Sequence, residues 1–226
     1  VGEMTHPAVM TNHSLSATGG DKVTTYAISA GYYFEDGMMF PQAFSRYNLR
    51  ASVDVHPVQF VKFGINMYGT HSDRDTGNSD ALQDAIRMRP TYHPTNLVTG
   101  EEEWAYSNGQ YNPLVAVQNE WNKTKMYNFI GNVYLELLPL PGLSVKTTFS
   151  PDYRINEIGQ YRGTYTKANK GANKATSNYA KNSNMNWVWD NQVSYTKAFG
   201  LNRIDLTGVF SMLETKAENL RGIGNG

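Results

Sequence analysis

The stretch RYNLRASVDVH, residues 46–56, decides the fold, because apolar and polar side chains alternate in it one by one. In an extended strand successive side chains point to opposite faces, so one face of this strand is apolar and the other is polar and charged. The apolar face carries Tyr47, Leu49, Ala51, Val53 and Val55. A strand of about ten residues with two such faces is typical of a transmembrane β-barrel wall, which has lipid outside and water inside.

The same alternation recurs along the chain and predicts about eight strands. They are expected at residues 11–19, 22–35, 44–56, 60–70, 124–137, 143–154, 185–199 and 202–215. The predicted fold class is therefore all-β. The strands form an antiparallel meander of about eight members, a segment of a transmembrane β-barrel that is incomplete by itself.

The connections between these strands alternate between short and long. Short ones are expected at residues 20–21, 57–59, 138–142 and 200–201, and long ones at 36–43, 71–123 and 155–184. Bacterial outer-membrane barrels have short periplasmic turns and longer extracellular loops, so this alternation predicts an orientation with both chain ends outside the cell. A barrel inserted from the periplasm should begin and end there, and no secretory signal peptide is visible at Val1. The sequence therefore suggests an internal piece of a larger barrel.

Composition agrees with this interpretation and excludes several function classes. Lysine plus arginine and aspartate plus glutamate balance at 20 each, so no basic surface for nucleic acid is expected. Cysteine is absent, which excludes disulfides and thiolate metal sites. The sequence has no apolar run long enough for a transmembrane helix, and its mean hydropathy is −0.52. A barrel is compatible with that value, because only alternate strand residues face lipid.

Several short motifs, in order along the chain, resemble the SusC/RagA-like TonB-dependent outer-membrane transporters. The first are HSLSATGG at residues 13–20 and TYAISAGY at residues 25–32. The later ones are Glu35-Asp36-Gly37, Arg46-Tyr47-Asn48-Leu49-Arg50, Lys62-Phe63-Gly64-Ile65-Asn66, Arg89-Pro90, Asn112-Pro113-Leu114 and Trp189-Asp190-Asn191. Together they cover nearly the whole chain.

This resemblance implies a place in the bacterial outer membrane, in contact with lipid. Members of the family are barrels of roughly 22 strands with a plugged lumen. They import oligosaccharides or peptides, are capped by a SusD-like surface lipoprotein, and draw energy from the TonB complex. Residues 1–226 would then be part of the barrel domain only. The plug domain, the TonB-contacting N-terminal part and the later strands would be missing, and no enzymatic activity is expected.

The longest connection, residues 71–123, holds most of the side chains that could bind something outside the cell. A short helix is expected through Ala81 and Ile86, with Ser79 as its N-cap and Pro90 at its end. Aromatic rings beside polar groups suit a sugar or a peptide, so four rings after the helix are predicted to bind a substrate or a partner. These are Tyr92, Trp104, Tyr106 and Tyr111. The alternative is packing within the loop, or contact with the plug and the lipoprotein cap.

Charged and amide side chains on the polar strand faces are predicted to line the lumen and tune what passes. These are Arg46, Arg50, Lys62, Asn66 and Glu136. The aspartates around residues 73–84 loosely resemble a calcium loop, but Gly77 is misplaced for an EF-hand and the closing glutamate is missing. No catalytic residue, metal ligand or cofactor is therefore predicted.

A second function class remains open, a soluble β-sandwich that acts as an adhesion or carbohydrate-binding module. In that fold the apolar strand faces would pack on each other. Strand length argues against it, because sandwich strands average about six residues and several of these strands are about twice as long.

Overall fold

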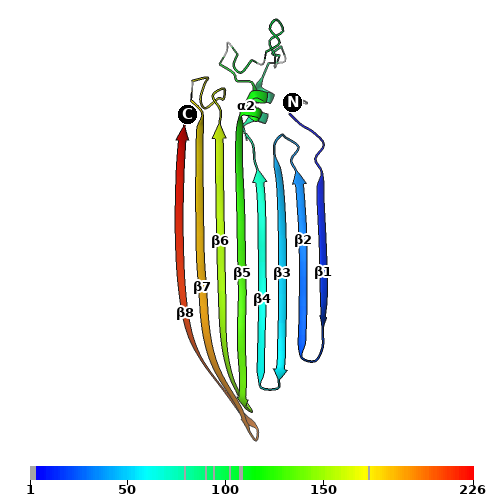
Figure 1. Ribbon diagram of the computed structural model, residues 1–226, viewed down its shortest axis with the longest axis vertical. Coiled ribbons are helices and arrows are strands. Elements are labelled where there is room, and N and C mark those ends of the chain that lie inside the picture. The colour runs from blue at the N-terminus through cyan, green and yellow to red at the C-terminus, as the bar shows by residue number, and fades with distance from the viewer. Residues whose placement is uncertain are drawn as a thin grey trace.

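The computed structural model describes residues 4–78, 80–89, 91–93, 95–101, 103–106, 109–172 and 174–226. Eight strands form one antiparallel sheet, and each strand pairs with the next in chain order (Figure 1). The strands are β1 (Met10–Gly20), β2 (Thr24–Asp36), β3 (Ala43–Val58), β4 (Val61–Asp75), β5 (Glu120–Leu140), β6 (Leu143–Arg162), β7 (Thr176–Phe199) and β8 (Asn202–Asn225). Two short helices, α1 (Ala81–Arg87) and α2 (Pro113–Asn119), lie in the longest connection. The predicted all-β meander is confirmed.

Strand pairing brings the apolar residues of all strands onto one face of the sheet. Val53 of β3 pairs with Ile65 of β4, and Ile65 pairs with Val133 of β5. We call the face that carries these residues the membrane face and the opposite one the inner face. Side chains on the membrane face are largely exposed, and Leu49, for example, is 56% exposed. The described residues form no second sheet to cover them, so the two-layer sandwich considered from the sequence is wrong.

The apolar run on the membrane face shifts steadily from strand to strand. In β2 it spans residues 26–34, and its middle residue lies in the pairing row of Phe129. In β8 it spans residues 204–212, and its middle residue lies in the row of Leu137. The shift is thus eight residues of β5 over the six inter-strand steps from β2 to β8. With about 3.3 Å per residue and about 4.8 Å between strands, the strands tilt by about 40° from the normal of the apolar band.

That tilt is the one that transmembrane barrel strands have, roughly 35–45°. The thickness of the band agrees as well. On β5 the apolar run extends from Tyr127 to Leu137, about 33 Å along the strand at about 3.3 Å per residue. Tilting reduces this length to about 25 Å, the height of the apolar band of outer-membrane barrels. Register, tilt and thickness therefore describe a sheet that crosses a bilayer.

The connections alternate as predicted, but the strands extend further at the end with the long loops. The short turns are residues 21–23, 59–60, 141–142 and 200–201, all at the lower end of the sheet in Figure 1. The expectation of loops throughout residues 71–123 and 155–184 is wrong, because strand pairing continues to Asp75, from Glu120, to Arg162 and from Thr176. Residues 216–225 are likewise strand, paired with β7.

Apart from Gly64 and Gly131 within the sheet, the few buried residues gather at the end with the long loops, beside both chain ends (Figure 1). Met4, Met39 and Ala81 form a small cluster against which α1 and α2 pack through Leu82 and Leu114. The helix expected through Ala81 and Ile86 is confirmed as α1. Its expected N-cap Ser79 and its expected end at Pro90 lie outside the described residues. No helix in the described part of the chain is long and apolar enough to cross a membrane.

Candidate functional site

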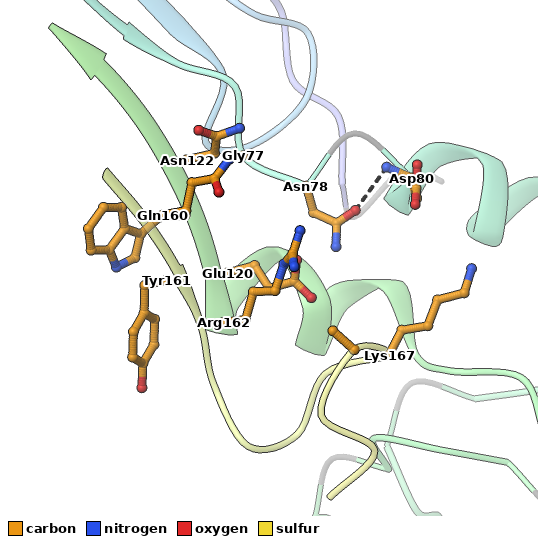
Figure 2. Close-up of a pocket in the computed structure, with 11 residues that line it drawn as sticks. Gly77, Asn78, Asp80, Glu120, Asn122, Gln160, Tyr161, Arg162 and Lys167 are labelled. Atoms are coloured by element: carbon orange, nitrogen blue, oxygen red, sulfur yellow. Dashed lines mark hydrogen bonds and ion pairs between the residues drawn. The ribbon is translucent and has the colours of Figure 1, made fainter. Parts of the chain in front are cut away.

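A polar cleft of about 270 Å³ lies where the upper ends of β5 and β6 meet the long loops (Figure 2). Its floor is the inner face of the sheet, since Glu120, Asn122, Gln160 and Arg162 alternate with outward-facing Trp121 and Tyr161. Trp121 and Tyr161 also border the cleft, and the other lining residues come from the loops. These residues are Gly77, Asn78, Asp80, Lys167 and Ala168.

Two ion pairs lie in and beside the cleft. Arg162 Nε lies 3.9 Å from Glu120 Oε2, and the two side chains run side by side in Figure 2. Lys167 Nζ lies 3.1 Å from Asp84 Oδ1, so it ties the loop of residues 163–175 to α1. Glu120 lies above the apolar band, and desolvation raises the pKa of its carboxyl group, while the nearby Arg162 guanidinium partly offsets that rise. The cleft thus offers a desolvated carboxylate, two cations and several amides.

Such a set of groups can hold a polar ligand by hydrogen bonds and charge. The described residues contain no group of three or more histidine, aspartate or glutamate side chains arranged to hold a metal ion. The aspartates near residues 73–84 are instead engaged separately. Asp73 lies 2.9 Å from His71, Asp75 lies 3.7 Å from Lys123, and Asp84 accepts from Lys167.

The four aromatic residues predicted to bind a substrate or partner form two ring pairs within the loop. Tyr92 stacks on Tyr106 with ring centroids 4.5 Å apart, and Trp104 lies 5.9 Å from Tyr111. Trp104 also meets Tyr165 of the next loop at 5.8 Å. The four rings therefore do not converge on one point. Their role in binding stays a prediction.

Tyr106 is the most buried of the four, with 9% exposure. Its hydroxyl donates a hydrogen bond to the His93 carbonyl oxygen at 2.9 Å. Burial raises the pKa of this phenol, and the nearby Glu103 adds to the rise. Tyr106 and Tyr92 also line an open hollow of about 480 Å³ in the loop. The turn beside the hollow exposes Leu97 by 77% and Val98 by 94%.

The five residues predicted to line the lumen share the inner face but lie at different heights. Register places Arg46 nearest the loops, Arg50 below it, Asn66 below that, and Lys62 with Glu136 nearest the short turns. Lys62 Nζ lies 3.5 Å from Glu136 Oε2, and Asn66 Oδ1 accepts a 2.6 Å hydrogen bond from Ser52. The Arg46 guanidinium lies 5.7 Å from the centre of the Tyr33 ring. Their role in selectivity stays a prediction.

Sequence reasoning missed a bridge across the inner face. Tyr134 of β5 reaches over β4 and donates a 2.6 Å hydrogen bond to Asp54 of β3. It can do so because Gly64 of β4, which lies between them, has no side chain to block the ring. Lys146 completes the group, with its Nζ 4.6 Å from the centre of the Tyr134 ring. The isolated glycine in a strand was the available signal, since such glycines often mark close approaches.

The cleft was also missed, because its strand residues were assigned to loops. Gln160 and Arg162 lie above the apolar band, where both faces of β6 meet water and the residue-by-residue alternation disappears. No single-sequence signal could show that Arg162 returns beside Glu120, since 41 residues separate them and only the hairpin register aligns the two.

Comparison with known proteins shows what this chain is similar to. No family model matches it. It is 26% identical over 220 residues to TonB-dependent receptor P3 of Formosa agariphila, covering 92% of this chain and 22% of that receptor. It is 29% identical over 234 residues to TonB-dependent receptor SusC of Bacteroides thetaiotaomicron, covering 88% of this chain and 22% of SusC. The chain therefore spans about a fifth of the length of these curated relatives.

Solved structures show the same fold. The chain superposes on the RagAB peptide importer in its closed-closed state with a TM-score of 0.79 and 16% identity, over 99% of this chain and 26% of that one. The open-open state gives a TM-score of 0.75 over 96% of this chain and 25% of that one. The resemblance to SusC/RagA-like TonB-dependent transporters is confirmed, with the chain as a barrel segment. The similarity places it in the bacterial outer membrane.

Proposed function

We propose that this chain forms part of the barrel wall and the outer loops of a TonB-dependent importer of oligosaccharides or peptides. The observation that carries the proposal is the oblique apolar run, whose shift of eight residues over six inter-strand steps gives the strand tilt of a membrane barrel. The polar inner face then borders the lumen. Arg46, Arg50, Lys62, Asn66 and Glu136 would act there as lumen-lining residues.

Substrate contact is proposed for the polar cleft and the aromatic rings beside it. The cleft opens at the end with the long loops, where an imported molecule would arrive first. Glu120, Arg162 and Lys167 supply charge, and Asn122 and Gln160 supply amides that suit either hydroxyl groups or peptide bonds. Trp104 and Tyr111 lie half-buried in the same loop region and add flat apolar surface.

One partner is proposed at the end of the sheet with the long loops, and the others are proposed to contact parts of the transporter outside residues 1–226. The exposed pair Leu97 and Val98 at the loop tip is proposed to contact a SusD-like surface lipoprotein, since exposed apolar residues on a loop suit a protein contact. The plug domain and the contact with the TonB complex are proposed to belong to other parts of the full-length transporter. The chain carries no catalytic step in this proposal and needs no cofactor.

The test uses the full-length transporter in its own cells. Deleting the gene should abolish growth on one group of nutrients, either oligosaccharides or peptides, and the wild-type gene should restore it. An Arg162→Gln variant should then lower uptake of the labelled nutrient several-fold, because it removes one of the two cations of the cleft. Lys22→Gln makes the same kind of change in the short turn at the other end of the sheet and should leave uptake unchanged.

Surface amount would be measured for each variant, so that loss of uptake is not confused with loss of protein. Unchanged growth of the deletion strain on every oligosaccharide and peptide tested would overturn the importer assignment. Equal uptake by the Arg162→Gln and Lys22→Gln proteins would leave the importer intact but remove the cleft from its substrate path.

A further inference from the structure

The membrane face has a notch below its outer edge, where a glycine is flanked on both neighbouring strands by the side chains of Leu49 and Phe129. Its floor is Gly69 of β4, where an added Cβ would find its nearest neighbour 3.9 Å away. The notch has a volume of about 400 Å³ and is almost wholly apolar. Its walls are Leu49, Phe129 and Tyr153, and its upper rim is the ring row of Tyr47, His71 and Tyr127.

The surroundings of the notch determine what can fill it. It lies within the apolar band, on the face that meets the bilayer, and in the half of the band nearer the long loops. In that half of the outer membrane the apolar material in contact with the protein is the acyl chains of outer-leaflet lipids. A straight chain can fill a narrow notch beside a glycine, because it needs no more width than one missing side chain.

A cation lies above the notch on the same face. Lys125 is four residues beyond Phe129 on β5, about 10 Å nearer the outside at about 3.3 Å per residue and about 40° of tilt. Its cross-strand neighbours are engaged elsewhere, since Asp73 lies 2.9 Å from His71 and Glu157 lies 3.3 Å from Lys181. No ion pair in the described part of the chain involves Lys125, which leaves its ammonium group available to an anion.

Two outward rings follow above Lys125. Trp121 and Tyr161 lie side by side on the membrane face, with ring centroids 6.1 Å apart and planes 20° apart. Trp121 is 41% exposed and lies over Gly159. Along their strands both residues alternate with inner-face residues, which places them on the membrane face, and both also border the cleft at the sheet's upper end. Flat aromatic rings above the charged row suit the apolar faces of sugar rings.

We propose that this stripe of β4, β5 and β6 binds a phosphorylated glycolipid of the outer leaflet. An acyl chain occupies the notch at Gly69, a phosphate meets Lys125, and sugars lie against Trp121 and Tyr161. From the notch outward the contacts are apolar, cationic and aromatic, and in such a lipid the acyl chain, the phosphate and the sugars follow in the same order. A phospholipid would use the first two contacts, and only a glycolipid would use all three.

The test is lipid retention by the full-length transporter. The purified protein would be placed in nanodiscs of phosphatidylethanolamine with a minor share of lipid A that keeps its first core sugars, and bound lipid would be counted by native mass spectrometry. Wild-type protein should retain the glycolipid. Gly69→Leu fills the notch and Lys125→Ala removes the cation, so each should lower retention several-fold, and Trp121→Ala should lower it for the glycolipid but not for phosphatidylglycerol.

Matched controls keep the result interpretable. Gly208→Leu adds the same side chain on the membrane face of β8, where an added Cβ meets nothing within 4 Å, and Lys197→Ala removes a lysine near the short turns. Both should retain lipid as the wild type does. Gly69→Ala and the exposed Lys125→Ala keep the test valid if Gly69→Leu fails to insert. Equal retention by Lys125→Ala and wild type would overturn the proposal, as would loss of a protein dimer, rather than of lipid, in the Gly69 variants.

Discussion

The membrane face of the sheet carries different side chains inside the apolar band and above it, toward the long loops. Inside the band, the membrane face of β5 carries aromatic and aliphatic side chains from Tyr127 to Leu137. Above it, the same face of neighbouring strands carries Lys125, Glu157 and Lys181 in one row. The strands and their pairing do not change between the two regions. Alternation of apolar and polar side chains therefore arises where the two faces meet different solvents, and it ends where both faces meet water.

Aromatic residues show the same contrast. Phe129 in the band is 39% exposed, whereas Tyr106 in the loop is 9% exposed and stacked on Tyr92. In water the first arrangement would leave a large apolar surface bare, and lipid removes that cost. In the loop, water surrounds the chain, so the rings pack inward.

The largest effect is expected from a charge in the middle of the apolar band. Ile65 pairs with Val53 and Val133, near the centre of the apolar runs on these strands. Ile65→Arg should lower the free energy of unfolding by roughly 2–4 kcal/mol, the usual cost of a cation on the lipid face near the midplane. Urea denaturation of the full-length protein in lipid vesicles would measure the loss.

Thr148→Arg is the matched control for this charge. Thr148 lies on the inner face, with Asp190 as its cross-strand neighbour, so an arginine there should be nearly neutral. Ser52 is less suitable, because its hydroxyl donates to Asn66. Equal losses for the two arginine variants would show that the faces do not meet different solvents.

This division explains how much of the molecule could be predicted from its sequence. The strands and faces within the band follow from alternation, as at residues 46–56, because burial in lipid selects every second side chain. The upper part of β7, residues 176–184, lies in an expected loop, because both its faces meet water and its Lys, Asn, Thr and Ser residues show no alternation. The cleft depends on the pairing of Glu120 with Arg162, which no local pattern encodes.

Two glycines of β4 lie on opposite faces of the sheet and should respond differently to an added methyl group. Gly64 lies on the inner face under Tyr134, whereas Gly69 lies on the membrane face and forms the floor of the notch. Gly64→Ala should displace Tyr134 from Asp54 and lower the free energy of unfolding by about 1–3 kcal/mol, since it combines crowding with a lost hydrogen bond. Gly69→Ala should stay within about 0.5 kcal/mol, as expected where no contact is disturbed.

The same urea denaturation would measure both alanine variants. Their difference is the quantity of interest, because each adds one methyl group to the same strand. A Gly69→Ala protein as unstable as Gly64→Ala would mean that backbone freedom, rather than the Tyr134 bridge, requires glycine at these positions.

The smallest effect is expected in the loop. Tyr106→Phe keeps the ring on Tyr92 but removes the donor to the His93 carbonyl, which should cost about 1 kcal/mol of local stability. Limited proteolysis of the intact transporter should show faster cleavage near residues 91–101, with the urea transition of the barrel unchanged. Unaltered cleavage would indicate that the hydrogen bond contributes nothing to loop order.

The central claim is that the sheet crosses the outer membrane with its short turns inside and its long loops outside. Residues 1–226 contain no cysteine, so once any cysteine elsewhere in the full-length protein is replaced, a single one can be introduced at Lys170 in the loop after β6 or at Pro141 in the turn before it. A membrane-impermeant maleimide added to intact cells should label Lys170→Cys at once and Pro141→Cys only after the outer membrane is permeabilised. Labelling of Pro141→Cys on intact cells, with Lys170→Cys protected, would contradict the account.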